Sequence, residues 1–199
     1  AYAFYPDSLG FDNKPLYVID AAKVAALSPF KTSKFQPSAA AIHPKLQKLY
    51  ILSSASNQLT VTELNGVVES VHKLSPKLFP QAEGITFKQN GEMYISNEGV
   101  NAKATLLKFP YIAVSEVAKQ EIIKSGYNFS SPNEKMELGK HLTEISGIAY
   151  VPSTGQMLAE YDEKGDIFTI DFSKKNDLVG KVKFGGKGDY EDIVYTDTA

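Results

Sequence analysis

The sequence predicts an all-β fold, and three observations carry that prediction. Short apolar runs alternate with turns rich in Gly, Asn and Asp, which is the pattern of β-strands joined by hairpins. One unit of such runs recurs, with Ile42, Ile85, Ile148 and Ile193 at equivalent positions and steps of 43, 63 and 45 residues between them. A repeat of about 40–45 residues holding three or four short strands is the signature of a β-propeller blade. We therefore expect a β-propeller of four-stranded antiparallel blades, with these four isoleucines buried.

The clearest copy of the unit spans residues 81–111. Two apolar runs, Ile85–Phe87 and Met93–Ile95, flank the pair Asn90-Gly91. Asn-Gly between strand-like runs is the strongest short hairpin signal, because both turn residues tolerate a positive φ. The same pattern predicts whole blades near residues 38–72 and near residues 144–184.

The rest of the chain fits a single domain over residues 1–199. The fourth copy opens at Glu191 and holds one strand, whereas residues 1–20 hold two strand-like runs without an inner strand. Joining the two gives a split blade from residues 191–199 and 1–20. The insert at residues 112–140 explains the long step, and its segment Val114–Lys124 has helical composition.

The composition excludes several classes of function. The net charge is −2, so the chain has no electrostatic footprint for nucleic acid or for an anionic membrane. No apolar run approaches the roughly 18 residues of a membrane span. Cysteine is absent, which excludes disulfides and thiolate metal sites. All 21 basic residues are Lys, so the usual bidentate clamp for phosphate, Arg, is missing.

Acidic residues stand at the openings of the repeats. Glu83 and Glu191 lie two residues before their isoleucines, and Glu144 and Ser38 lie four residues before theirs. Positions two and four apart on a strand share one side, so these side chains should converge at the mouth of the central channel. Ser146 should join them.

The loops after the second strands should approach the same face, and they would bring Asn97, Glu98 and Asp162 to it. Carboxylates that converge without Arg either hold raised pKa values or bind a cation. Oxygen ligands favour a hard ion, Ca²⁺ before Mg²⁺. The alternative is that these glutamates bond to neighbouring backbone N–H groups and cap the blades.

Motifs for catalysis are missing from the sequence. It has no Gly-x-Ser-x-Gly elbow, no P-loop and no His-Glu-x-x-His. His43, His72 and His141 lack metal-ligand spacing, and His43 precedes a turn proline. The sequence therefore identifies no catalytic residues, and these stay unknown.

Several strings resemble the SdiA-regulated family of bacterial propeller proteins, which is similar to phytase-like and NHL-type propellers. They are LTEISGIAY, the loop at Asp162–Gly165, KFGGKGDYEDI, PSAAAIHP, and QAEGITF followed by GEMYISNEG. The resemblance implies an extracytoplasmic propeller, secreted, periplasmic or derived from a lipoprotein parent. Some related propellers bind calcium at channel glutamates, which by motif match implies Glu83, Glu144 and Glu191 as metal ligands.

The order of the segments departs from that family. There, the segment resembling Tyr127–Asp197 comes first and the segment resembling Ala1–Tyr111 comes last, with about two blades between them. We therefore expect an incomplete or circularly permuted propeller. The family order favours an open arc, whereas economy of strands favours a ring closed by the two termini.

Three functions remain open from the sequence. The first is a non-enzymatic binding protein for a small molecule, a glycan or a protein, with calcium at the channel mouth. The second is a calcium-dependent hydrolase of the phosphoester or lactone type. The third is a structural subunit that completes its ring with a partner chain, since unpaired strand edges recruit partners.

Overall fold

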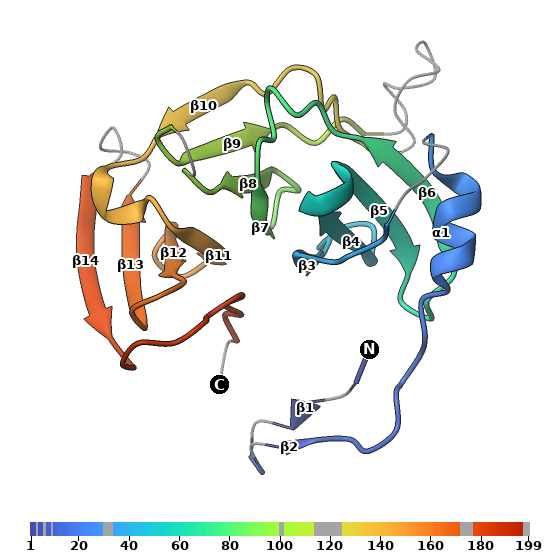
Figure 1. Cartoon of the computed structure of the whole chain (residues 1–199), viewed down its shortest axis with the longest axis horizontal. Helices are drawn as coiled ribbons and strands as arrows, with labels where there is room; N and C mark the ends of the chain where they lie inside the picture. Colours follow the sequence, from blue (N-terminus) through green and yellow to red (C-terminus); the bar gives the residue numbers. More distant parts are fainter. Residues whose placement is uncertain are drawn as a thin grey trace.

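The computed structural model describes residues 1–2, 4–5, 7–8, 10–29, 34–99, 102–113, 125–171 and 177–196. It is an arc of three four-stranded antiparallel sheets arranged around a common centre, with the two termini on the open side (Figure 1). The predicted all-β propeller fold is thereby confirmed. The helix predicted within Val114–Lys124 lies outside the described residues.

Blade 1 is a meander in sequence order. Its strands are β3 (Ala39–Ile42), β4 (Lys48–Ser53), β5 (Gln58–Glu63) and β6 (Val68–Lys73). The predicted Asn-Gly turn joins the last two strands: Gly66 has a φ of 89°, and the side-chain oxygen of Asn65 accepts from the N–H of Val67 (3.1 Å).

Blade 2 takes its outer strand from beyond the expected range of 81–111. It consists of β7 (Ala82–Phe87), β8 (Met93–Asn97), β9 (Thr105–Phe109) and β10 (Glu134–Glu137). In β10, Met136 pairs with Leu106 of β9 and is buried. The insert therefore contributes to the sheet. A short strand with one apolar residue gives little periodic signal, so the sequence pattern did not reveal it.

Blade 3 is again a meander in sequence order. Its strands are β11 (Ile145–Val151), β12 (Gln156–Tyr161), β13 (Asp166–Asp171) and β14 (Asp177–Lys183), in that order. Two short 3-10 helices, Ser54–Ser56 and Lys140–Leu142, precede β5 and β11.

The N-terminal residues form a small sheet of their own. Strands β1 (Phe4–Tyr5) and β2 (Gly10–Phe11) pair with each other, and helix α1 (Ala21–Leu27), capped by Asp20, leads on to blade 1. No helix in the described part of the chain has the length and apolar character needed to cross a membrane. Residues 191–196 are not assigned to a strand. The split blade from residues 191–199 and 1–20 stays a prediction, because residues 197–199 lie outside the description.

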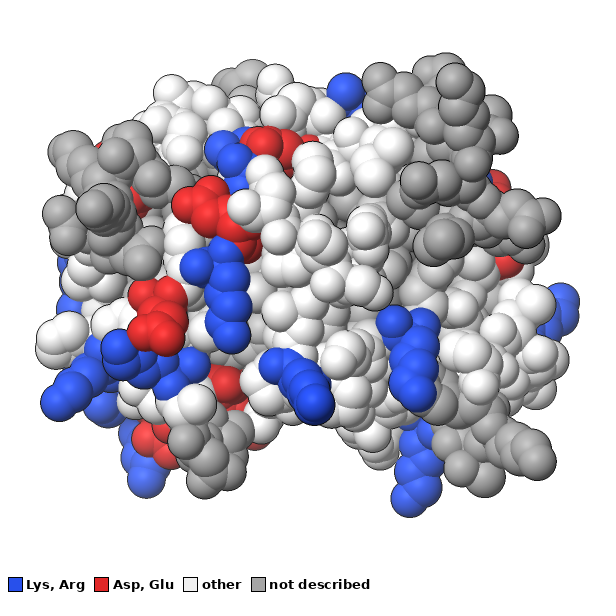
Figure 2. Space-filling model, turned by 90° about the horizontal axis from the view of Figure 1, so that it is seen from above, with Lys and Arg blue, Asp and Glu red and all other residues white. Residues whose placement is uncertain are grey.

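The core lies between neighbouring blades. One cluster joins blades 1 and 2 around Tyr50 and Phe109, and a second joins blades 2 and 3 around Tyr94 and Met157. The rim that carries β10 has Lys and acidic side chains intermixed on its surface (Figure 2).

The sequence predicts that all four repeat isoleucines are buried, but the structure buries only two of them fully. Ile85 and Ile148 are 3% and 1% exposed, whereas Ile42 is 52% exposed and Ile193 is half-buried. The prediction for Ile42 is wrong, because Ala39 and Ala41 of β3 face the core shared with blade 2, whereas Ile42 takes the opposite face of the strand, at the open side of the arc.

Candidate functional site

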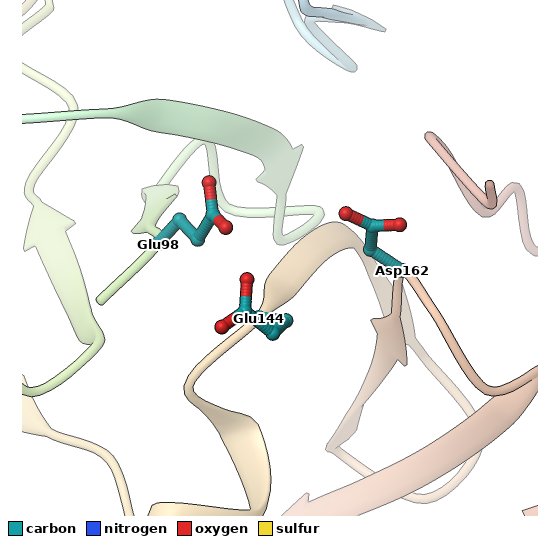
Figure 3. A group of neighbouring side chains, drawn as sticks. All are labelled: Glu98, Glu144 and Asp162. Atoms are coloured by element: carbon teal, nitrogen blue, oxygen red, sulfur yellow. The ribbon is translucent and has the colours of Figure 1, made fainter. Parts of the chain in front are cut away.

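Three carboxylates meet at the junction of blades 2 and 3. Glu98 follows β8, Glu144 precedes β11 and Asp162 follows β12. One carboxylate oxygen of each lies within 4.8 Å of the others (Figure 3). We call these three residues the acidic cluster, and the place where they lie the channel mouth.

The backbone is irregular where the inner strands enter this site. The register of β7 against β8 shifts between Ala82 and Gly84, which leaves Glu83 as the extra residue. The register of β11 against β12 shifts between Ile145 and Ile148. Such β-bulges redirect a side chain at the end of a strand and are over-represented beside functional sites. Glu83 owes its position at the channel mouth to the first of them.

Burial and repulsion by neighbouring carboxylates raise the pKa values of Glu98 and Asp162 in the acidic cluster. Burial raises the pKa of Glu98 to about 8, assisted by a hydrogen bond with Glu144 and by the charges of Glu144, Glu83 and Asp162. The pKa of Asp162 is raised by burial and by Asp189, Glu163 and Glu144. In the part of the chain that the structure describes, no lysine forms an ion pair with Glu98, Glu144 or Asp162.

The site holds a carboxylate that the sequence patterns did not identify. Glu160 on β12 is 3% exposed, and its Oε2 atom is buried without a hydrogen-bond partner. Burial raises its pKa to about 7, with further contributions from Asp192, Asp162 and Glu191. Burial also raises the pKa of Asp192 to about 6. The sequence did carry a signal for Glu160, because it is an acidic residue inside the strand-like run Gln156–Tyr161.

The three glutamates expected as metal ligands take different positions. Glu144 is in the acidic cluster. Glu83 lies beside it, and burial together with the charges of Glu191 and Asp162 raises its pKa, while hydrogen bonds with Ser54 and Gln81 oppose the shift. Glu191 is exposed at the edge of the site, where burial and Asp189 and Asp162 raise its pKa.

The polar residues expected at the channel mouth make structural bonds. Ser38 Oγ donates to the carbonyl of Ala82 (2.9 Å), and Ser146 Oγ donates to the carbonyl of Tyr190 (2.8 Å). Asn97 is buried, and its amide donates to Thr105 Oγ1 (3.0 Å). Their assignment as channel-mouth contacts stays a prediction.

The donor set determines what the site can bind. It offers carboxylate oxygens and no nitrogen or sulfur ligand. Such a set suits hard cations, and Ca²⁺ accepts six to eight oxygens in flexible geometry. The site also holds two carboxyls, Glu98 and Glu160, with pKa values of about 8 and about 7. Carboxyls with such pKa values are suited to proton transfer near neutral pH.

Comparison with sequence families gives one match. Residues 12–101, just under half of the chain, match the model described as SdiA-regulated. No curated protein matches the sequence.

Solved structures give similarity of fold alone. They include virginiamycin B lyase from Staphylococcus aureus (17% identity, 76% of this chain and 42% of that chain, TM-score 0.44). Others are the β-propeller domain of Cps50 (Swd1) from Myceliophteria thermophila (10%, 79% and 46%, TM-score 0.49) and PQQ-bound aldose sugar dehydrogenase from Streptomyces coelicolor (14%, 78% and 51%, TM-score 0.45). The chain spans about half, or less, of the length of each of these proteins. Over residues 12–101 it carries the sequence pattern of the SdiA-regulated family, on an arc of β-propeller blades.

Proposed function

We propose that this protein is an extracytoplasmic binding propeller that holds a divalent cation, calcium, at its channel mouth. The observation that carries the proposal is the convergence of Glu98, Glu144 and Asp162 within 4.8 Å of one another. Carboxylates this close repel one another, so the apo site is costly, and a cation removes that cost. Glu83 and Glu191 add negative charge around the three ligands.

The buried carboxylate of Glu160 supports the same proposal independently. Its Oε2 atom is buried and unpartnered, which costs roughly 1–3 kcal/mol or more for a polar group. Asp162 and Glu191 are among the groups that raise its pKa. A cation at the channel mouth would offset the charge of Glu160 at neutral pH.

The expected affinity is consistent with a location outside the cytoplasm. The cluster residues come from three separate loops and are partly exposed, so the site lacks the rigidity of a dedicated twelve-residue calcium loop. Extracellular calcium modules bind with dissociation constants of about 10⁻⁴–10⁻³ M. Calcium at the concentrations of the cytosol would leave such a site empty. Fractionation of the source cells, followed by immunodetection, tests the location; recovery in the cytosolic fraction contradicts it.

Isothermal titration calorimetry with CaCl₂ and with MgCl₂ tests the cation site. We expect binding of Ca²⁺ with a stoichiometry of one, and weaker binding of Mg²⁺. Glu144→Gln and Glu98→Gln should each weaken Ca²⁺ binding at least tenfold. Glu137→Gln is the matched control, since Glu137 is exposed and pairs with Lys103 on the rim (2.8 Å). Equal affinity in all four proteins would refute the site.

A calcium-dependent hydrolase is the second candidate function. Glu98 and Glu160 favour it, because carboxyls with pKa values near neutrality serve as general acids or bases. The substrates would be phosphoesters or lactones whose oxygens complete the coordination of the cation. Chromogenic phosphoesters and simple lactones, each with and without Ca²⁺, test this function. Absence of turnover with any divalent metal would leave the binding function alone.

A further inference from the structure

Residues 190–195, which we call the fourth inner segment, repeat a contact that joins successive blades. Ser38 Oγ, directly before the inner strand of blade 1, donates to the carbonyl of Ala82 in the inner strand of blade 2 (2.9 Å). Ser146 Oγ, in the inner strand of blade 3, donates to the carbonyl of Tyr190 (2.8 Å). The segment is therefore bonded to the inner strand of blade 3 as the inner strand of blade 2 is bonded to blade 1.

Two glycines show the same relation between neighbouring backbones. A Cβ atom on Gly84 of β7 would lie 2.5 Å from the carbonyl oxygen of Ser146. A Cβ atom on Gly147 of β11 would lie 2.5 Å from the backbone nitrogen of Ile193. Both positions exclude any side chain, because the next inner strand passes directly over them. The fourth inner segment thus packs on β11 as β11 packs on β7.

The fourth inner segment also keeps the register of the repeat. In three of the four repeats, the isoleucine and the aromatic residue two positions later line one groove of about 470 Å³. These pairs are Ile85 and Phe87, Ile148 and Tyr150, and Ile193 and Tyr195. The segment therefore occupies the place of the inner strand of a fourth blade.

That inner strand lacks the sheet that the other blades have. In the three described blades, each inner strand pairs with the next strand of its meander. Residues 191–194, by contrast, belong to no sheet of the described structure, and the side chain of Val194 is 76% exposed. An inner strand with an open edge is a template for strand addition.

The N-terminal hairpin, by contrast, is a two-stranded sheet without the inner strand of a blade. The pairing of β1 with β2 continues through bonds from the N–H of Leu16 to the carbonyl of Ala1 (2.9 Å) and from the Ala1 amino group to the carbonyl of Tyr17 (2.8 Å). An isolated two-stranded sheet is at best marginally stable. This one also exposes Tyr2, Tyr5 and other large apolar side chains, by 51–72%.

The hairpin is anchored on the opposite side of the same opening. A Cβ atom on Gly66, in the β5–β6 turn of blade 1, would lie 2.6 Å from the carbonyl oxygen of Val18. From this contact the hairpin extends across the open side of the arc, between blade 1 and the C-terminal end (Figure 1). The two incomplete pieces therefore border one gap.

We propose that the chain closes its own ring, with residues 1–5 adding to residues 191–195 as the second strand of a fourth blade and residues 10–18 forming the third. Closure covers the open edge of the fourth inner segment and the exposed apolar side chains of the hairpin. It also fixes Glu191 at the channel mouth. The inference does not depend on the proposed cation site, since it concerns the backbone of the two termini.

Engineered disulfides test the closure in a chain that has no cysteine of its own. Val194→Cys is combined with Tyr2→Cys in one protein and with Tyr5→Cys in another, to allow for two registers. Leu64→Cys with Val194→Cys is the matched control, because Leu64 is also exposed but lies at the β5–β6 turn of blade 1. After mild oxidation, non-reducing gels and peptide mass spectrometry separate bonds within a chain from bonds between chains.

We expect an intrachain disulfide in at least one test pair, at ten times or more the yield of the control pair. Equal yields in test and control proteins would overturn the proposal, as would disulfides found only between two copies, which indicate exchange of hairpins. Hydrogen exchange on the unmodified protein gives a second measurement, which requires no substitution. Protection of the amides of Asp192 and Val194 supports closure, since the N–H of Ile193 already donates to Asp192 Oδ1 (2.8 Å), and exchange at the rate of an unstructured peptide overturns it.

Discussion

Replacing Glu160 by Gln should change how the stability of this protein depends on pH. Burial is the main cause that raises the pKa of Glu160, from 4.5 to about 7. The folded protein therefore favours the protonated carboxyl. The stabilisation from this group is complete below about pH 4.5 and is lost as the pH rises through 7. One pKa unit corresponds to about 1.4 kcal/mol, so the shift is equivalent to roughly 3 kcal/mol.

Urea unfolding at pH values from 5 to 8.5, in the presence of a chelator, measures this effect. We expect the wild type and Glu160→Gln to have similar free energies of unfolding near pH 5. Near pH 8 the variant should be more stable by up to about 3 kcal/mol, because Gln stays neutral. Glu137→Gln, on the exposed rim, should follow the wild type throughout. Parallel profiles for the wild type and Glu160→Gln would refute the assignment of a raised pKa to Glu160.

Three further predictions concern packing and charge. Ile85→Ala should lower the free energy of unfolding by roughly 2–5 kcal/mol in urea, as for other buried truncations, and a loss below 1 kcal/mol would contradict the observed burial. Gly84→Ala should be markedly destabilising, because a Cβ atom at Gly84 would lie 2.5 Å from the carbonyl oxygen of Ser146. Gly139→Ala is the control and should not be destabilising, because a Cβ atom there would have no neighbour within 4 Å. Equal melting temperatures of the two variants would contradict the close approach at Gly84. Calcium should raise the melting temperature of the wild type at pH 8 more than that of Glu144→Gln, and equal shifts would exclude Glu144 as a ligand.

The fold was predictable because its signals are local. Hairpin turns such as Asn65-Gly66 and strand-length apolar runs lie within a few residues of one another, and the repeat multiplied them. Strand β10 was not predicted, because it pairs with β9 across residues 110–133 and because a short edge strand needs few apolar residues. Burial of Ile42 was predicted wrongly because burial depends on which sheet packs alongside, which the repeat does not encode.

The expectations for the candidate site rest on equally local signals. Strand alternation predicts Glu144 at the channel mouth, and the meander predicts Glu98 and Asp162 at the same end; one carboxylate oxygen of each lies within 4.8 Å of the others. The bulge at Glu83 cannot be predicted from the two-residue alternation of side chains along a regular strand. Glu160 was missed because the strand pattern predicts which face a residue takes but not whether water reaches that face.

The serine and glycine contacts between inner strands make this molecule a row of units joined only to their neighbours. Blade 2 packs against both of the others, through β3 with β7 and β7 with β11, whereas blades 1 and 3 each have one full neighbour. Stability in such arrays is approximately a sum of unit and nearest-neighbour terms. Unfolding should therefore begin at the fourth position, where the two termini meet, and amides of β8, in the blade opposite it, should be the last to exchange with solvent.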